Sequence, residues 1–184
     1  MTTGLVMIDI QNDYFSGGKM ELVSMESAAE NAAGVLDGFR RRGDPVYHIQ
    51  HLSVRPGATF FVPGTEGVEI HSSVAPLEAE PVIQKNFPNG FRGTDLLERL
   101  RGDGIERLVI CGAMSHMCID ATTRAAFDHG FQCTVVSDGC ATRNLEFGGR
   151  VVAARDVHAA FMAALAVPYA AIVAAAELGG GDDE

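Results

Sequence analysis

The stretch GAMSHMCIDATTRAAFDHG, from Gly112 to Gly130, decides both the fold and the chemistry that this sequence suggests. It follows the apolar run LVIC at Leu108–Cys111, so it predicts a buried strand, a tight turn and a helix that begins near Cys118. A thiol in the first turn of a helix lies at the positive end of the helix dipole, which favours the thiolate. Free cysteines are, however, most often buried as small apolar groups. Other residues must decide whether Cys118 is a nucleophile.

Composition predicts one globular domain over residues 1–178. The 184 residues are 47% hydrophobic and 21% charged, which is enough apolar material for a sizeable core. The glycines and acids of GGGDDE at 179–184 predict a flexible acidic tail.

The net charge, the cysteine spacing and the N-terminal residues indicate where the protein is located and which partners it is not expected to bind. The net charge of −10 argues against nucleic acid as a partner. No apolar run approaches the ~20 residues of a membrane helix. The start MTTGLVMIDIQND lacks the features of a signal peptide, so a cytoplasmic location is expected. The four cysteines show no CxxC spacing, which favours reduced thiols over disulfides or structural zinc.

Short apolar runs alternate with helical patterns along the chain. The runs are nearly continuous, as is typical of parallel strands buried on both faces. The predicted fold class is therefore α/β, a doubly wound and mostly parallel sheet with helices on both faces. The aperiodic segment 51–79 is long enough to suggest a functional loop. Strands are predicted at 5–10, 45–50, 81–84, 107–112 and 132–138, and helices at 25–42, 93–102, 118–129 and 156–165.

Three reactive side chains lie at the carboxyl ends of predicted strands, where open parallel sheets bind ligands. Asp9 ends the first strand, Lys85 ends the third, and Cys118 follows the fourth. Together they offer a base, a cation and a nucleophile, although taken singly Asp9 could be structural and Lys85 a surface residue. Backbone amides of the turn before Cys118 are suited to holding an oxyanion. His116 is only two residues from Cys118 and need not face the thiol.

Four segments carry a resemblance over nearly the whole chain: IDIQNDYF with Asp9, PGATFFVPGTEGVEIH, VIQKNFPNGFRGTDLLERL with Lys85, and VICGAMSHMCIDATTRAAFDHGF with Cys118. They resemble the isochorismatase-like cysteine hydrolases, a superfamily that includes nicotinamidases and N-carbamoylsarcosine amidohydrolases. The resemblance implies a six-stranded, Rossmann-like sheet with strand order 3-2-1-4-5-6. It also implies a homodimer or larger homo-oligomer, which the apolar run at 167–176 allows.

The resemblance implies particular roles as well. Asp9, Lys85 and Cys118 would form a catalytic triad, and the backbone N–H groups of Met114 and Cys118 an oxyanion hole. A non-proline cis peptide would join Ala113 to Met114. Candidates for the substrate pocket, each of which could equally belong to the core or an interface, are Gln11, Phe15, Gln50, Phe60, Phe61 and Phe87.

Two departures from the family pattern narrow the expected activity. Nicotinamidases of the family carry an Asp-x-His pair and a second His for a metal, whereas the matching positions here are His51, Ser53 and Phe60. One imidazole does not make a metal site, so neither a metal nor a cofactor is expected. Isochorismatases proper lack the nucleophilic cysteine that this chain has at Cys118.

The predicted function is therefore metal-independent hydrolysis of a small-molecule, amide-type C–N bond through a thioester on Cys118. Two alternatives stay open: hydrolysis of an ester or cyclic amide, and a catalytically weak protein that binds a small molecule.

Overall fold

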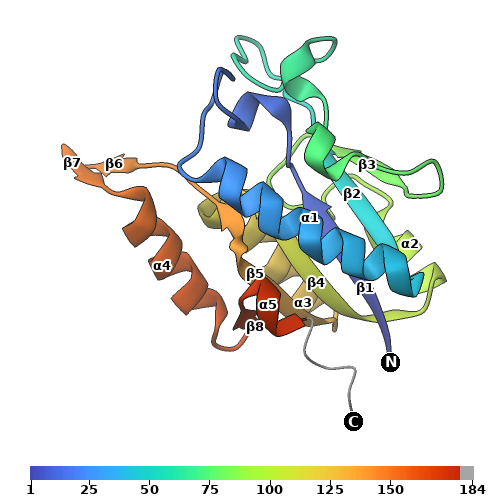
Figure 1. The fold of residues 1–184 in the computed structure, drawn as a ribbon. Helices are drawn as coiled ribbons and strands as arrows, with labels where there is room; N and C mark the ends of the chain where they lie inside the picture. Colours follow the sequence, from blue (N-terminus) through green and yellow to red (C-terminus); the bar gives the residue numbers. More distant parts are fainter. Residues whose placement is uncertain (179–184) are drawn as a thin grey trace.

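A six-stranded parallel sheet lies at the centre of the computed structural model, which describes residues 1–178 (Figure 1). The predicted tail at 179–184 lies outside the described residues. The strand order β3-β2-β1-β4-β5-β8 winds outward in both directions from β1 and β4. This order confirms the predicted doubly wound α/β class. The strands are β1 (Thr2–Ile8), β2 (Val46–His51), β3 (Val82–Lys85), β4 (Ile105–Ala113), β5 (Gln132–Ala141) and β8 (Ala170–Val173).

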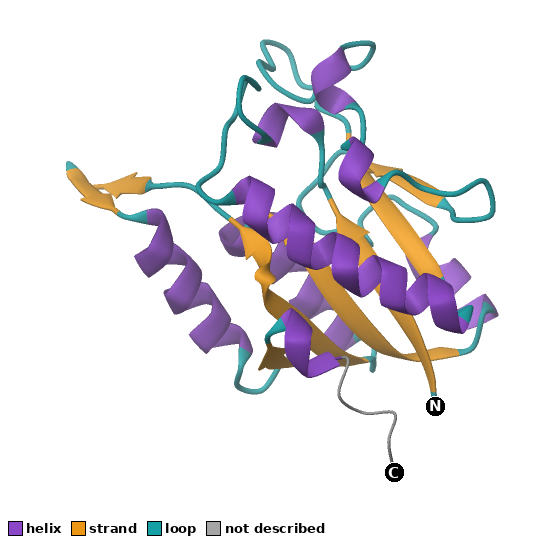
Figure 2. Ribbon diagram, viewed as in Figure 1, coloured by secondary structure: helices purple, strands orange, loops and turns teal. Residues whose placement is uncertain are grey.

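Helices cover both faces of the sheet (Figure 2). Successive side chains of a strand point to opposite faces, so β1 contributes to two cores. Leu5 and Met7 pack in the core under α1, whereas Val6 and Ile8 pack in the core with α2, α3 and α4. Helix α5 contacts α1. The helices are α1 (Met25–Arg42), α2 (Leu96–Gly102), α3 (Asp120–Asp128), α4 (Ala154–Leu165) and α5 (Ala175–Leu178).

The resemblance implied a sixth strand, but the sequence pattern did not locate it: 167–176 was treated as an apolar run that allows an interface or packs on its own domain. In the structure the run adds an edge strand to β5, in a register from Cys133 beside Ala170 to Val136 beside Val173. Alanine is depleted in strands, so this alanine-rich run gives a weak strand signal. Part of the run is therefore used inside the chain's own sheet.

The long segment after β2 folds over the carboxyl ends of the strands, at the top of Figure 1. The buried carboxylate of Asp13 holds it there by accepting a hydrogen bond from the N–H group of Phe61 at 2.7 Å, and it also accepts one from Lys19 N–H, before α1, at 3.1 Å. A Cβ at Gly67 would lie 2.2 Å from Asp13 Oδ1, so only glycine fits beside this carboxylate. The segment's short 3₁₀ turns are η2 (Glu66–Val68) and η3 (Ser72–Val74), and η1 (Asn12–Tyr14) precedes α1.

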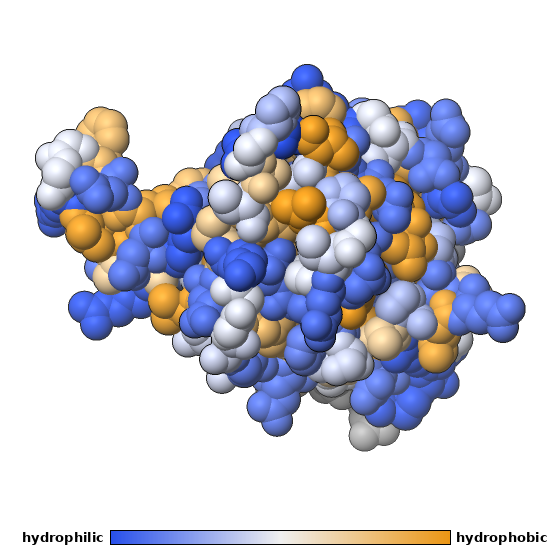
Figure 3. All heavy atoms as spheres, turned by 90° about the horizontal axis from the view of Figure 1, so that it is seen from above, coloured by the Kyte–Doolittle hydropathy of each residue, from blue (hydrophilic) through white to orange (hydrophobic). Residues whose placement is uncertain are grey.

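A two-stranded antiparallel hairpin, β6 (Leu145–Phe147) and β7 (Arg150–Val152), projects from the body of the molecule (Figure 1). Seen from above, it stands out at the left, and hydrophobic side chains lie along it (Figure 3). Phe147 is 88% exposed and Val151 is 62% exposed. These are large apolar side chains for a surface position.

Two sequence-based predictions, one about membrane-spanning helices and one about free thiols, concern residues 1–178. Among residues 1–178, no helix combines the length and apolar content needed to cross a membrane. All four cysteines are free, as the spacing predicted, and all four are buried.

Candidate active site

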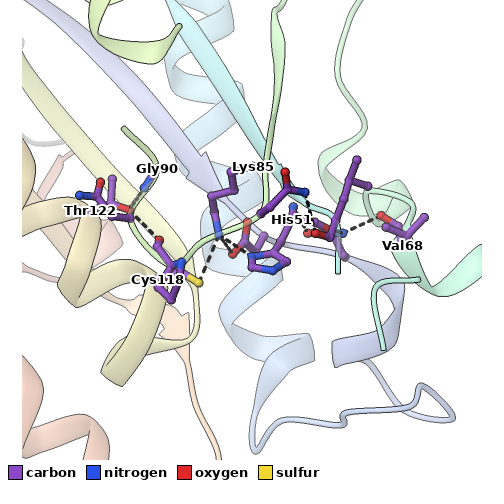
Figure 4. Close-up of polar contacts among 12 residues, drawn as sticks. His51, Val68, Lys85, Gly90, Cys118 and Thr122 are labelled. Atoms are coloured by element: carbon purple, nitrogen blue, oxygen red, sulfur yellow. Dashed lines mark hydrogen bonds and ion pairs between the residues drawn. The ribbon is translucent and has the colours of Figure 1, made fainter. Parts of the chain in front are cut away.

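The strand ends bring the three predicted catalytic side chains into contact. Asp9 follows β1, Lys85 is the last residue of β3, and Cys118 lies in the turn after β4. Lys85 Nζ is 2.7 Å from Asp9 Oδ2 and 3.3 Å from Cys118 Sγ (Figure 4). The three residues are 0%, 1% and 2% exposed, in chain order. One ammonium group thus joins a carboxylate and a thiol away from water.

Charge and burial set the protonation of these groups. Burial, followed by the Asp9 charge, raises the pKa of the Cys118 thiol, and the Lys85 charge opposes this only in part. Burial would lower the pKa of the Lys85 ammonium, but Asp9 and Cys118 outweigh it and raise that pKa. The resting site therefore holds an ammonium group beside a protonated thiol. The helix dipole was expected to favour the thiolate at Cys118, but burial and the Asp9 charge act in the opposite sense and raise the pKa of the thiol.

The turn that carries Cys118 is π-helical rather than the first turn of an α-helix. It spans Ser115–Ile119, and α3 begins only at Asp120. The N–H groups of Met117 and Ile119 both donate to the Met114 carbonyl, at 3.0 and 3.3 Å. Single π turns of this kind are frequent at functional sites. The predicted helix at 118–129 therefore starts later than its sequence pattern indicated.

Neighbouring residues tie this turn to the end of β5. The peptide bond between Ala113 and Met114 is cis, the geometry that the resemblance implied. Ser115 Oγ donates to the Ala141 carbonyl at 3.2 Å, and His116 Nδ1 lies 2.6 Å from Thr142 Oγ1. The His116 ring is thus engaged by Thr142 instead of by the thiol.

The loop after Lys85 is tied to α3 by Thr122 (Figure 4). Thr122 Oγ1 accepts from Gly90 N–H at 2.9 Å and lies 3.4 Å from the Pro88 carbonyl. These contacts link the segment that carries the lysine to the helix that follows the cysteine.

His51 is a site residue that the sequence analysis considered only as a remnant of a metal site. It ends β2 beside Lys85 in the strand register, and its Nδ1 lies 2.9 Å from Lys85 Nζ. Burial and the Lys85 charge lower the pKa of His51 to about 4, so the neutral ring accepts a hydrogen bond from the ammonium. Its position at the end of a strand at the same sheet edge was the signal that could have identified it.

Potential metal ligands do converge here. Ligand atoms of Asp9, His51 and Cys118 all lie within 4.8 Å of one another. The Lys85 ammonium contacts all three side chains, so a protein cation already lies among them. A metal ion bound by this set would have to displace the lysine.

Tyr14 is a second residue that the sequence analysis missed. It is buried, and its ring lies 4.6 Å from the Phe61 ring and 6.3 Å from the Phe60 ring, between centroids. Burial, followed by the charges of Cys118 and Asp9, raises the pKa of its hydroxyl. The hydroxyl therefore stays protonated at neutral pH.

The two predicted pocket glutamines have their amide groups occupied within the fold. Gln11 Nε2 donates to the carbonyls of His51 at 3.0 Å and Val68 at 2.6 Å, and its Oε1 accepts from His51 N–H. Gln50 Nε2 also donates to the Val68 carbonyl, and its Oε1 accepts from Gln84. The structure thus places both amides under the long segment, where they hold η2.

The predicted pocket phenylalanines separate into two groups. Phe60 and Phe61 contact Tyr14, and the Phe61 ring lies 5.9 Å from that of His51, so this pair lies beside the site. Phe15 stacks on His71 at 3.6 Å and lines a cavity of about 560 Å³ that no triad residue lines. Phe87 is 39% exposed, with the Arg92 guanidinium 3.7 Å above its ring. The structure does not bring Phe15 to the triad and places Phe87 at the surface.

Known proteins are similar to this chain in sequence and fold. The model of the isochorismatase domain matches residues 3–177. An uncharacterised isochorismatase family protein of Bacillus subtilis, YddQ, is 56% identical over 94% of this chain and 96% of its own. The crystal structure of a putative isochorismatase hydrolase from Oleispira antarctica is 52% identical, with a TM-score of 0.93 over 98% of this chain and 97% of its own. Maleamate amidohydrolase of Pseudomonas putida is 30% identical over 73% of this chain and 70% of its own.

Proposed function

The chain belongs to the isochorismatase family, and from that premise we propose that it is a metal-independent cysteine hydrolase. Its substrate would be a small molecule with an amide-type C–N bond. One observation carries the proposal: a single buried ammonium, that of Lys85, contacts both the Asp9 carboxylate and the Cys118 thiol. The P. putida relative, whose name is that of an amidohydrolase, supports the reaction class.

Acylation begins with the protonated thiol. Asp9 takes the Cys118 proton as the sulfur attacks the carbonyl carbon, and the amides of Met114 and Cys118 hold the oxyanion that forms. Asp9 then gives the proton to the leaving nitrogen, the C–N bond breaks, and a thioester remains on Cys118. Before attack, Asp9 and Cys118 share one proton and carry one negative charge between them, which the Lys85 ammonium balances.

Deacylation uses the same carboxylate. Asp9 takes a proton from water as the water oxygen attacks the thioester carbonyl. The C–S bond then breaks, the sulfur regains the proton from Asp9, and a carboxylic acid leaves. An ester or cyclic amide would follow the same steps, so the substrate class must be tested directly.

The test is a Cys118→Ala variant assayed with a panel of small amides, with ammonia release as the readout. We expect no turnover by the variant and an unchanged circular dichroism spectrum, because alanine removes only the sulfur. Mass spectrometry of the unmodified protein should show an acyl adduct on Cys118 during turnover. Cys133→Ala, which removes a buried thiol near the start of β5, at the opposite end of the parallel strands from the triad, is the matched control and should keep its activity. A Cys118→Ala variant that still hydrolyses amides would refute the covalent mechanism.

A further inference from the structure

The Lys85 ammonium has three N–H bonds, and each of them has an acceptor inside the site. Asp9 Oδ2, His51 Nδ1 and Cys118 Sγ lie 2.7, 2.9 and 3.3 Å from Lys85 Nζ (Figure 4). A lysine side chain donates three hydrogen bonds and accepts none. The ammonium therefore has no N–H left for a substrate or a water molecule. Another group must orient whatever reacts beside it.

The contact with Lys85 fixes the position of the proton on the His51 ring. Nδ1 accepts a hydrogen bond from the ammonium, so the neutral ring carries its proton on Nε2. No residue among 1–178 accepts a hydrogen bond from this Nε2, and the side chain is partly exposed. His51 thus offers one N–H donor that the fold itself does not use.

The fold holds the end of β2 that carries this donor. The Gln11 amide clamps the backbone of His51 from both sides: its Nε2 donates to the carbonyl at 3.0 Å, and its Oε1 accepts from the N–H at 2.8 Å. The Phe61 ring packs against the imidazole, with 5.9 Å between the ring centroids. A donor held in this way is suited to a step that needs a fixed geometry.

Asp9 offers the complementary acceptor. Its Oδ2 accepts from Lys85, whereas its Oδ1 is buried and has no hydrogen-bond partner among residues 1–178. A buried acceptor without a partner costs free energy and needs an explanation. In the proposed mechanism Oδ1 is the oxygen that can take a proton. Once the Cys118 sulfur carries the acyl group, that proton has to come from water.

The separation of the two groups suits one bridging water molecule. Ligand atoms of Asp9, His51 and Cys118 all lie within 4.8 Å of one another. A water molecule that makes two hydrogen bonds of about 2.8 Å joins atoms that are about 4–5 Å apart. A water held between His51 and Asp9 would therefore lie beside the sulfur that carries the thioester.

We propose that His51 is a catalytic residue of deacylation: its Nε2–H donates to the attacking water while Asp9 Oδ1 accepts a proton from the same water. One lone pair of the water is then held by His51, and the other attacks the thioester carbon. The new O–C bond forms as the proton passes to Asp9. The C–S bond then breaks, and the Cys118 sulfur takes that proton from Asp9. The second water hydrogen stays in the carboxylic acid, and His51 keeps its own proton.

This inference rests on the proposed function for the thioester, and its test separates the two halves of the reaction. The probes are 4-nitrophenyl acetate and 4-nitrophenyl butyrate, two activated esters of different size. The first turnover of released 4-nitrophenolate measures acylation of Cys118. The decay of the acyl adduct, followed by rapid quenching and mass spectrometry, measures deacylation. Cys118→Ala gives the background release.

Three variants are compared with the unmodified protein. His51→Ala removes the donor, and His51→Gln replaces the ring with an amide that can both accept from Lys85 and donate to water. The control is His129→Ala, at an exposed histidine just after α3.

His51→Ala should slow the decay of the adduct by about 10- to 100-fold, the effect of one lost hydrogen bond in a transition state, and should slow acylation far less. The adduct on Cys118 should therefore accumulate. Hydroxylamine attacks thioesters without a positioned water and gives a hydroxamic acid, so it should restore the decay. His51→Gln should lose less than His51→Ala, and His129→Ala should change neither rate.

The outcomes separate this inference from the proposed function. If acylation and deacylation fall by the same factor in His51→Ala, the ring acts only by holding Lys85, and its role toward water is overturned while the hydrolase stands. Unchanged rates in His51→Ala would overturn that role as well. An unmodified protein that forms no adduct with either probe would refute the covalent mechanism and the inference together. Thermal unfolding of each variant checks its folding, and His51→Gln provides the comparison if His51→Ala does not fold.

Discussion

At the scale of single residues, Lys85 determines which proton movements the site allows. Its ammonium contacts Asp9 at 2.7 Å, His51 at 2.9 Å and Cys118 at 3.3 Å. Removing one partner from a buried ion pair leaves a charge without compensation, which is strongly destabilising. A proton can pass between Cys118 and Asp9 beside this ammonium without changing the net charge of the site. The lysine therefore permits the acid and base steps that we propose for Asp9.

An Asp9→Asn substitution should separate the reactivity of the thiol from catalysis. Turnover should fall by about 10²–10⁴, the range for loss of a positioned general base. Alkylation of Cys118 by iodoacetamide at pH 7 should become faster. The Asp9 charge raises the pKa of the thiol, so its removal beside an intact Lys85 increases the thiolate fraction at any pH below that pKa.

Both rates are to be measured on the same preparations across pH 6 to 9. Asp156→Asn, at a carboxylate that is 62% exposed on α4, is the control and should change neither rate. Slower alkylation in Asp9→Asn would mean that the carboxylate activates the thiol already at rest.

Activity should survive exhaustive chelation. The Lys85 ammonium already contacts Asp9, His51 and Cys118, the side chains whose ligand atoms converge. A metal would have to displace it and desolvate a second cation in its place. Dialysis against a strong chelator, with elemental analysis and assay before and after, measures this. Loss of activity that zinc, iron or manganese restores would contradict it.

The sequence was sufficient to predict which residues meet and insufficient for how they interact. Asp9, Lys85 and Cys118 end or follow apolar strands, and the ends of parallel strands share one edge, so their convergence follows from pattern alone. The contact of His51 with Lys85 depends on strand register, which no local pattern records. The raised pKa of the Cys118 thiol depends on burial and on a carboxylate more than a hundred positions earlier. The local dipole argument therefore omitted the two effects that raise this pKa.

At the scale of elements, predictions from sequence held where apolar runs were strong. Strands β1 and β4 are central, and their buried runs were recognised. Strand β8 was missed because its alanines carry little β propensity, and the β6–β7 hairpin because three-residue strands give almost no periodicity. The π turn at Ser115–Ile119 was read as the start of a helix, since helical spacing alone does not distinguish the two.

Glu80→Gln should lower the free energy of unfolding by about 1–3 kcal/mol at pH 7. Glu80, just before β3, accepts two 2.7 Å hydrogen bonds from Arg40 on α1 and lies 2.8 Å from His48 Nε2 on β2. Burial alone would raise the pKa of Glu80, but the hydrogen bonds from Arg40, Leu77 and His48 lower it to about 2. The substitution therefore removes a junction between a helix and two strands.

The pH dependence provides the check. A carboxylate whose folded pKa is depressed stabilises the protein above its unfolded pKa of about 4.3, and this contribution is lost as pH falls toward 2. Urea unfolding should therefore show a difference between the two proteins at pH 7 that shrinks below pH 4. Glu106→Gln, at an exposed carboxylate, is the control. A difference independent of pH would assign the loss to packing instead of charge.

At the scale of the whole molecule, we expect a homodimer or larger homo-oligomer. An isolated two-stranded hairpin is at best marginally stable, yet β6–β7 projects with Phe147 and Val151 exposed. Exposed apolar side chains of this size favour contact with another surface, and closed symmetric assemblies of one chain are the common solution.

Light scattering at micromolar concentration tests the assembly. A double variant with Phe147→Ser and Val151→Ser should shift the mass toward the monomer. Val54→Ser, at a valine that is 65% exposed in the long segment, is the control and should leave the mass unchanged. A monomeric mass for the unmodified chain would show the expectation to be wrong.

The position of β3 at the edge of the sheet affects how the protein loses its activity on heating. This strand has four residues and pairs only with β2, yet it carries Lys85. Short outer strands open in local fluctuations that leave the central elements folded, and such openings cost less than global unfolding. Each opening of β3 takes the ammonium away from Asp9 and Cys118. As the temperature rises, activity should therefore be lost in parallel with the amide hydrogen exchange of β3. This loss should occur at a lower temperature than the unfolding of β1 and β4.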